Sequence, residues 1–157
     1  MGARAIERAH DAVCDVLAAR LEAAITAVET DRGLSAGAIV DPVLVRAYTP
    51  QDRAEPIVLV YPVAAEPDRP AGQRNKVWDV DVVVQYSAYY GVDVEAGLLD
   101  ALRVHSALLD VIDAATAAGD PTDAGFVLAP WRSDDLAIDQ QRTRLTWSQE
   151  IRVKVAA

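Results

Sequence analysis

The chain has 157 residues, 52% of them hydrophobic, and this length is typical of one domain with a sizeable buried core. Its 24 acidic and 15 basic residues give a formal net charge of −9. That charge argues against tight nucleic-acid binding, which depends on Lys and Arg at the phosphates. The apolar runs are short and interrupted by charges, whereas a membrane span needs about 20 consecutive apolar residues. We expect a single domain over residues 1–157 that does not span a membrane.

Residues 1–30 contain no uninterrupted apolar region that would serve as a secretory signal. Cys14 is the single cysteine, which excludes an internal disulfide and fits a reducing compartment. With only two histidines beside it, it does not furnish a recognisable zinc set. We therefore expect folding in the cytoplasm, without a metal or another cofactor.

The first predicted element is a long amphipathic helix from Arg4 to about Thr30, because apolar residues recur there every three or four positions. Gly33 follows, where a left-handed C-terminal cap prefers glycine. Two short β-branched runs, Val43–Tyr48 and Ile57–Tyr61, predict strands. The segment between the second run and Lys76 is rich in proline and polar residues, so we expect a long loop.

Residues 77–89 predict a long strand with one dry and one wet face. The expected inward side chains are Trp78, Val80, Val82, Val84 and Tyr86. The expected outward side chains are Asp79, Asp81, Gln85 and Ser87.

A second helix is predicted to begin at an Asp93 cap and to stop at Gly119, just before Pro121. Its expected apolar stripe consists of Val94, Leu98, Leu102, His105, Leu109 and Ile112. Residues 125–131 predict another strand, and an acidic turn around Asp134 and Asp135 follows.

The last predicted strand, Arg144–Val155, alternates apolar and polar residues like the strand at 77–89. Helix, three strands, helix and two strands give the order α-β-β-β-α-β-β. Half-wet strands are typical of antiparallel sheets. We predict an α+β fold with a mainly antiparallel sheet of about five strands and two long helices on one face.

The wet faces of the two long strands carry opposite charges. Asp79 and Asp81 stand on one strand, and Arg144, Arg152 and Lys154 on the other. We hypothesise that these strands are neighbours, because opposed charges on adjacent strands help to set the register.

The sequence offers poor candidates for catalysis, and we expect no enzyme. A nucleophilic site needs a nucleophile, a base and an orienting group held together. Cys14 is placed in the first helix as a small apolar residue, and His105 on an apolar stripe is interpreted as a core or interface histidine. His10 is placed at the surface. Asp134, Asp135 and Asp139 lack the ligand pattern of a calcium loop.

The order and lengths of these pieces resemble the tail-terminator family of long-tailed bacteriophages and phage-derived gene transfer particles. The resemblance covers most of the chain. The pieces are the N-terminal helix, Glu55-Pro56-Ile57-Val58-Leu59-Val60-Tyr61-Pro62, a loop, the strand Lys76–Tyr89, the acidic-capped helix with Ala101-Leu102 and Ala107-Leu108-Leu109, and the closing strand Trp147–Val155.

The resemblance implies a structural subunit of the virion, assembled in the host cytoplasm. It would form a ring, expected to be a hexamer, that caps the tail tube, stops its polymerisation and joins the tail to the head connector. The implied partners are further copies of the chain, the tail tube protein and the head connector or other neck proteins. DNA would only pass through.

The candidate interface residues come from this sequence rather than from a family motif. The loop 66–75 is either a docking element or an inert hairpin tip, and Trp131 with Arg132 is either an aromatic anchor or a surface rim. The wet sheet face lines an interface or channel, or is simply hydrated. The residues are Glu66, Asp68, Arg69, Gln73, Arg74, Asp79, Asp81, Gln85, Trp131, Arg132, Arg144 and Arg152.

Two alternatives stay open. One is another neck component, such as a head-closure or tail-completion protein. The other is a small-molecule-binding or enzymatic α+β domain whose pocket would be lined by His105, Trp78 and Trp147.

Overall fold

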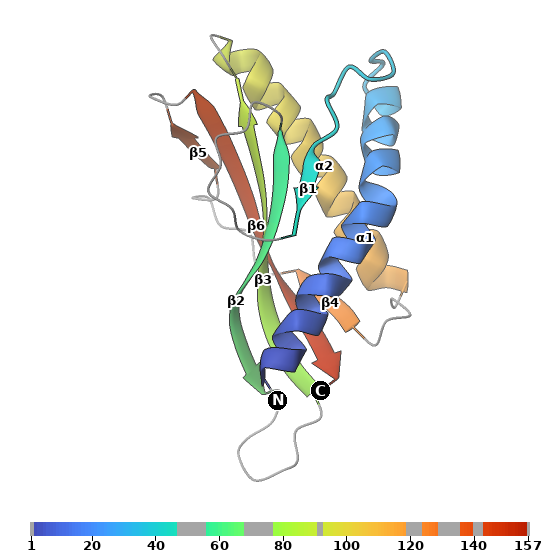
Figure 1. The fold of residues 1–157 in the computed structure, drawn as a ribbon. Coiled ribbons are helices and arrows are strands. Elements are labelled where there is room, and N and C mark those ends of the chain that lie inside the picture. Colours follow the sequence, from blue (N-terminus) through green and yellow to red (C-terminus); the bar gives the residue numbers. More distant parts are fainter. Residues whose placement is uncertain are drawn as a thin grey trace.

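The computed structural model describes residues 2–46, 56–67, 77–90, 93–118, 124–128, 136–139 and 143–156. Within them the chain has an α+β fold of two helices and six strands (Figure 1). In chain order these are α1 Gly2–Asp31, β1 Val43–Val45, β2 Ile57–Pro67, β3 Val77–Tyr89, α2 Val94–Ala118, β4 Ala124–Leu128, β5 Leu136–Asp139 and β6 Arg144–Ala156.

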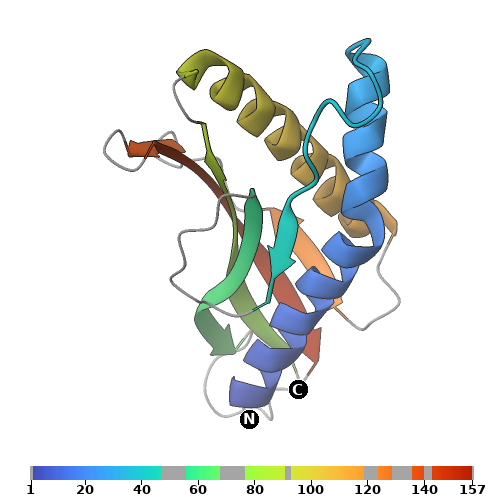
Figure 2. The same ribbon diagram turned by 45° about the horizontal axis from the view of Figure 1, so that its top comes forward.

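The described strands form one sheet in the order β1-β2-β3-β6-β4, and β5 pairs with the N-terminal end of β6. Every pairing is antiparallel except that of β1 with β2. Both helices lie on the same face of the sheet (Figure 1, Figure 2). We call the opposite face the outer face. The predicted mainly antiparallel sheet with both helices on one face is therefore confirmed.

The ends of the helices carry the predicted caps. Gly33 has a φ of 68°, and the N–H of Leu34 donates to the carbonyl of Glu29 at 2.8 Å, which closes α1 in the left-handed manner that glycine favours. At the start of α2, a carboxylate oxygen of Asp93 accepts a hydrogen bond from the N–H of Ala96 at 3.0 Å. Local sequence therefore determines where α1 ends and where α2 begins.

The predicted extents of several strands need correction. β2 continues to Pro67, through residues expected to form a loop, because β3 offers a long partner strand. Its pairing register shifts between Pro62 and Ala64, which accommodates an irregularity in the strand. β5 was not predicted; its four residues pair with β6 beyond the expected acidic turn. β1 ends at Val45, and the rest of the predicted run to Tyr48 begins with a bend at Arg46.

The hydrophobic core lies between the helices and the inner face of the sheet. Apolar side chains of both helices join those of β2, β3 and β6 in one cluster. In β3 the predicted inward side chains are confirmed: Val80, Val82, Val84 and Tyr86 are buried in this cluster, and Trp78 packs against it half-buried. Ser87, which was predicted on the wet face, is buried instead. One apolar layer thus holds both helices on the sheet.

The buried face of α2 differs from the predicted stripe. The buried residues of α2 are Ala101, Val104, His105, Ala107, Leu108, Val111, Ile112 and Ala115. Val94 and Leu102 are exposed instead, and Leu98 and Leu109 are only half-buried. The helix is apolar over a wider arc than one sheet contact covers, so periodicity alone did not fix its rotation.

Gly97 in the first turn of α2 allows a close approach of Tyr90. A β-carbon added at Gly97 would meet Cβ of Tyr90 well inside contact distance, and Tyr90 packs against the core. Alanine normally stabilises a helix relative to glycine by about 1 kcal/mol. We nevertheless expect Gly97→Ala to lower the free energy of unfolding by about 1–3 kcal/mol in urea denaturation, because overpacking dominates.

The control is the same substitution on a Tyr90→Gly background, where the opposing β-carbon is absent. There Gly97→Ala is expected to be neutral or stabilising. Equal destabilisation in both backgrounds would contradict the steric explanation.

Candidate functional site

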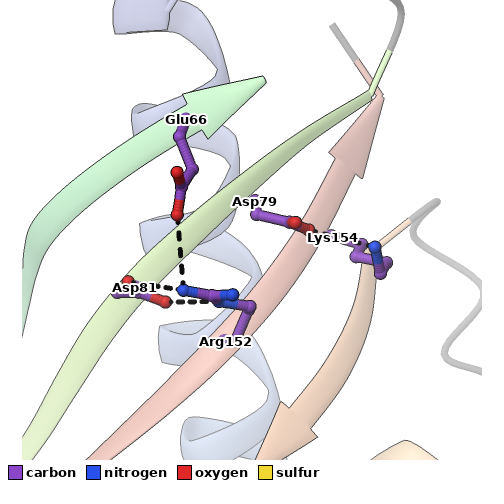
Figure 3. Close-up of polar contacts among 5 residues, drawn as sticks. All are labelled: Glu66, Asp79, Asp81, Arg152 and Lys154. Atoms are coloured by element: carbon purple, nitrogen blue, oxygen red, sulfur yellow. Dashed lines mark hydrogen bonds and ion pairs between the residues drawn. The ribbon is translucent and has the colours of Figure 1, made fainter. Parts of the chain in front are cut away.

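A ladder of charged side chains crosses three strands on the outer face of the sheet (Figure 3). We define this charged ladder as Glu66, Asp79, Asp81, Arg152 and Lys154. The register of β3 with β6 sets Asp81 opposite Arg152 and Asp79 opposite Lys154, and the register of β2 with β3 sets Glu66 opposite Asp79. The hypothesis that the two long strands are neighbours with opposed charges is confirmed for these pairs.

Arg152 is the centre of the charged ladder. Its Nε donates to Asp81 Oδ1 at 2.8 Å, and its Nη2 donates to Asp81 Oδ2 at 3.2 Å and reaches Glu66 Oε1 at 3.5 Å (Figure 3). Such two-point contact is the strongest geometry for an arginine and a carboxylate. The hydrogen bond and the charge of Asp81 raise the pKa of Arg152 further above its already high ordinary value. Arg152 therefore stays charged.

Asp79 and Asp81 are less exposed than the basic residues of β6 with which they pair. Lys154 Nζ lies 3.2 Å from Asp79 Oδ1, and the side chains of Asp79 and Asp81 are only 13% and 15% exposed. Arg152 and Lys154 are about half exposed, at 42% and 45%. Because both basic side chains of the ladder are paired within the chain, a partner protein would have to compete for them.

Two other candidate residues share the outer face but lie outside the charged ladder. Arg144 stands opposite Tyr89 and donates from Nη1 to Ser87 Oγ at 3.0 Å. It precedes Arg152 by eight positions on β6, which is about 26 Å along an extended strand. Gln85 is half-buried opposite Ser148. The outer face thus carries polar groups along its length, concentrated at the two ends.

The remaining interface candidates lie outside the described residues, so their roles stay predictions. They are Asp68, Arg69, Gln73, Arg74, Trp131 and Arg132. Glu66, which was assigned to the loop with them, belongs to β2 and to the charged ladder instead.

Cys14 is fully buried on α1, in agreement with its predicted apolar role. Burial raises the pKa of its thiol to about 11, although nearby Arg46 opposes this in part. The thiolate form that would act as a nucleophile is therefore scarce at neutral pH. His10, predicted at the surface, is half-buried; its Nε2 lies 3.2 Å from the carbonyl oxygen of Val60 and 3.7 Å from Cys14 Sγ.

His105 is buried beneath α2, with its ring 4.4 Å from that of Trp147. Burial lowers its pKa from 6.5 to about 4, so the imidazole is neutral at pH 7. The structure does not bring Trp78 to this pair. Trp147 stands opposite Tyr86 and Trp78 opposite Val155, eight positions further along β6. The proposed pocket of His105, Trp78 and Trp147 is therefore not assembled.

The sequence did not predict a groove that lies between α1 and the segment leading into β1. Its volume is about 180 Å³, and Glu22 and Asp41 are its charged lining residues. No local signal marks it, because α1 supplies one wall and residues 41–44 supply the other.

The chain matches no protein-family model and no curated protein sequence. Among the described residues, no group of three or more His, Cys, Asp and Glu side chains is placed to hold a metal ion. No described helix is long and apolar enough to cross a membrane.

We expect the pairing of Asp81 with Arg152 to contribute measurably to stability. In a double-mutant cycle with Asp81→Asn and Arg152→Gln, the coupling energy should exceed that of the exposed pair Asp15–Arg46, whose side chains are 66% and 49% exposed. The readout is urea unfolding at low and high salt. A coupling energy no larger than that of the control pair would show that the charged ladder does not fix the register.

We also expect His105 to make stability depend on pH. Because its pKa falls from 6.5 to about 4 on folding, the unfolded chain binds the proton first as the pH drops. The neutral ring's contribution is complete above pH 6.5 and is lost as the pH falls towards 4. The free energy of unfolding should decrease by about 3 kcal/mol more than in His105→Phe between pH 7 and pH 4. Parallel pH profiles for the two proteins would contradict this.

Proposed function

We propose that this protein is a tail-terminator subunit of a long-tailed bacteriophage. It would form a ring, expected to be a hexamer, on the tail tube, stop tube growth and join the tail to the head connector. The ring would be part of the virion after assembly in the host cytoplasm. The observation that carries the proposal is that one face of the sheet is covered by helices while the opposite face is polar.

Those two faces differ in chemistry. Helices α1 and α2 cover the inner face, while no described helix packs on the outer face, which carries the charged ladder and Arg144 (Figure 1, Figure 2). A ring requires heterologous contacts, in which one surface of a subunit meets a different surface of its neighbour. A subunit with a helical face and a polar sheet face supplies two such surfaces.

The edge of β2 supports termination rather than open-ended growth. Beyond Leu59, within the described residues, no strand pairs with this edge. Pro62 and Pro67 lack N–H groups, the register shifts after Pro62, and His10 occupies the carbonyl of Val60. Prolines and irregular pairing are ordinary ways to block the addition of another strand. Contacts between subunits would then avoid the β2 edge. The sheet of one ring would therefore not extend into a second ring.

The acidic composition supports a role beside passing DNA. The net charge of −9 disfavours binding to phosphates, so DNA would move past the ring as cargo without adhering. The small-molecule alternative loses its support, because Trp78 does not join His105 and Trp147.

The direct test is polymerisation of the cognate purified tube protein with the chain added at substoichiometric amounts. We expect shorter tubes by electron microscopy, because each capped end loses its site for the next tube ring. A ring of fixed subunit number should be visible at one tube end.

The control is the same protein unfolded by heat before addition, which should leave tube length unchanged. Unchanged tube lengths with an excess of folded protein would overturn the proposed function. Binding along the sides of the tube would count against it as well, since a terminator acts only at an end.

A further inference from the structure

The groove between α1 and the β1 segment has the form of a docking site. The chain leaves the cap of α1, runs back alongside the helix and enters β1 (Figure 2). The groove lies between these two segments and has a volume of about 180 Å³. It is lined by Leu17, Ala18, Leu21, Glu22, Ile25, Asp41, Pro42 and Leu44.

Two contacts hold the returning segment on α1, one on each side of the groove in the sequence. Before the groove, the N–H of Ile39 donates to the buried carboxylate of Glu29 at 3.2 Å, and Ile39 itself is buried. After it, Arg46 Nη2 donates to Asp15 Oδ1 at 3.0 Å. Both walls are therefore set before any partner arrives, which reduces the conformational cost of binding.

The chemistry of the lining is apolar with two negative charges. The accessible apolar lining comes from exposed Ala18 and from half-buried Pro42 and Leu44, because Leu17, Leu21 and Ile25 are buried in the core. Among the described lining residues, the ionisable ones are Glu22 and Asp41, and both are exposed. Within the described part of the chain, neither carboxylate forms an ion pair. The groove thus offers one hydrocarbon surface and two acceptors for a cation.

We propose that this groove binds the side chain of an arginine or lysine on a different protein. Its volume is smaller than the roughly 300–1,000 Å³ of typical small-molecule pockets, but it suits one long side chain. The methylene stem would pack on Ala18, Pro42 and Leu44, and the cationic end would meet the two carboxylates. This proposal goes beyond the tail-terminator proposal and does not depend on it.

Charge and surroundings point to a basic partner rather than to a second copy. The chain carries a net charge of −9, so long-range attraction is stronger for a basic partner than for a second acidic copy. Val40 and Val43 stand beside the groove with 62% and 40% exposure. We therefore expect apolar residues next to the inserted arginine or lysine on the partner.

The test is a nuclear magnetic resonance titration of the isotope-labelled full chain with N-acetyl-arginine amide or N-acetyl-lysine amide. We expect weak, saturable shifts of the backbone amides around residues 17–25 and 39–44. N-acetyl-norleucine amide keeps the hydrocarbon stem without the charge and should cause much smaller shifts. No saturable shifts there, or equal shifts with norleucine amide, would overturn the proposal.

Variants with matched controls separate the groove from the rest of the helix surface. Ala18→Trp should fill the groove and abolish the shifts, whereas Ala19→Trp, at an exposed position outside it, should not. Each of Glu22→Gln and Asp41→Asn should raise the dissociation constant about two- to fivefold, and exposed Glu7→Gln should leave it unchanged. Circular dichroism checks that each variant is folded.

Sedimentation of the same variants tests the choice of occupant. If Ala18→Trp, but not Ala19→Trp, abolishes self-association of the chain, the groove receives a second copy and the assignment to a different protein is wrong. Unchanged sedimentation of both variants excludes a second copy as the occupant of the groove.

Discussion

The pairing of β3 with β6 is the constraint on which the rest of the structure depends. The two strands pair without interruption from Val77–Ala156 to Tyr89–Arg144. A slip by one residue would move every side chain of one strand to the opposite face. A one-residue slip of β6 would expose Ile151, Val153 and Val155, which are now in the core, and would bury Arg152 and Lys154. The apolar inner face and the charged ladder therefore enforce the same register from opposite sides.

Both helices depend on the inner face that this register creates. A sheet with one apolar face must cover it, and α1 and α2 do so side by side. His105 is buried as a consequence, since α2 carries it onto Trp147 of β6. Its low pKa is a consequence of this packing, because the shift comes from burial. The unreactive state of Cys14 on α1 likewise follows chiefly from burial.

The surfaces left over after folding differ in how much they offer a partner. On the outer face, Asp81 and Arg152 satisfy each other, so this face is polar without presenting many free charges. The edge of β2 is blocked by its prolines and by His10. The groove beside α1 is the opposite case, because Glu22 and Asp41 face solvent over an apolar lining. The three surfaces therefore differ in chemistry.

The sequence by itself determined the features that depend on neighbouring residues. The periods of 3.6 and 2 located both helices and the two long strands, Gly33 and Asp93 fixed helix ends, and the opposed charges identified β3 and β6 as neighbours. Tertiary structure decided the rest. β2 extends past Pro62 because β3 supplies its partner, Leu102 is exposed because the sheet covers only part of α2, and the groove joins residues far apart in the chain. Local patterns do not encode such contacts, since these form only when distant segments meet.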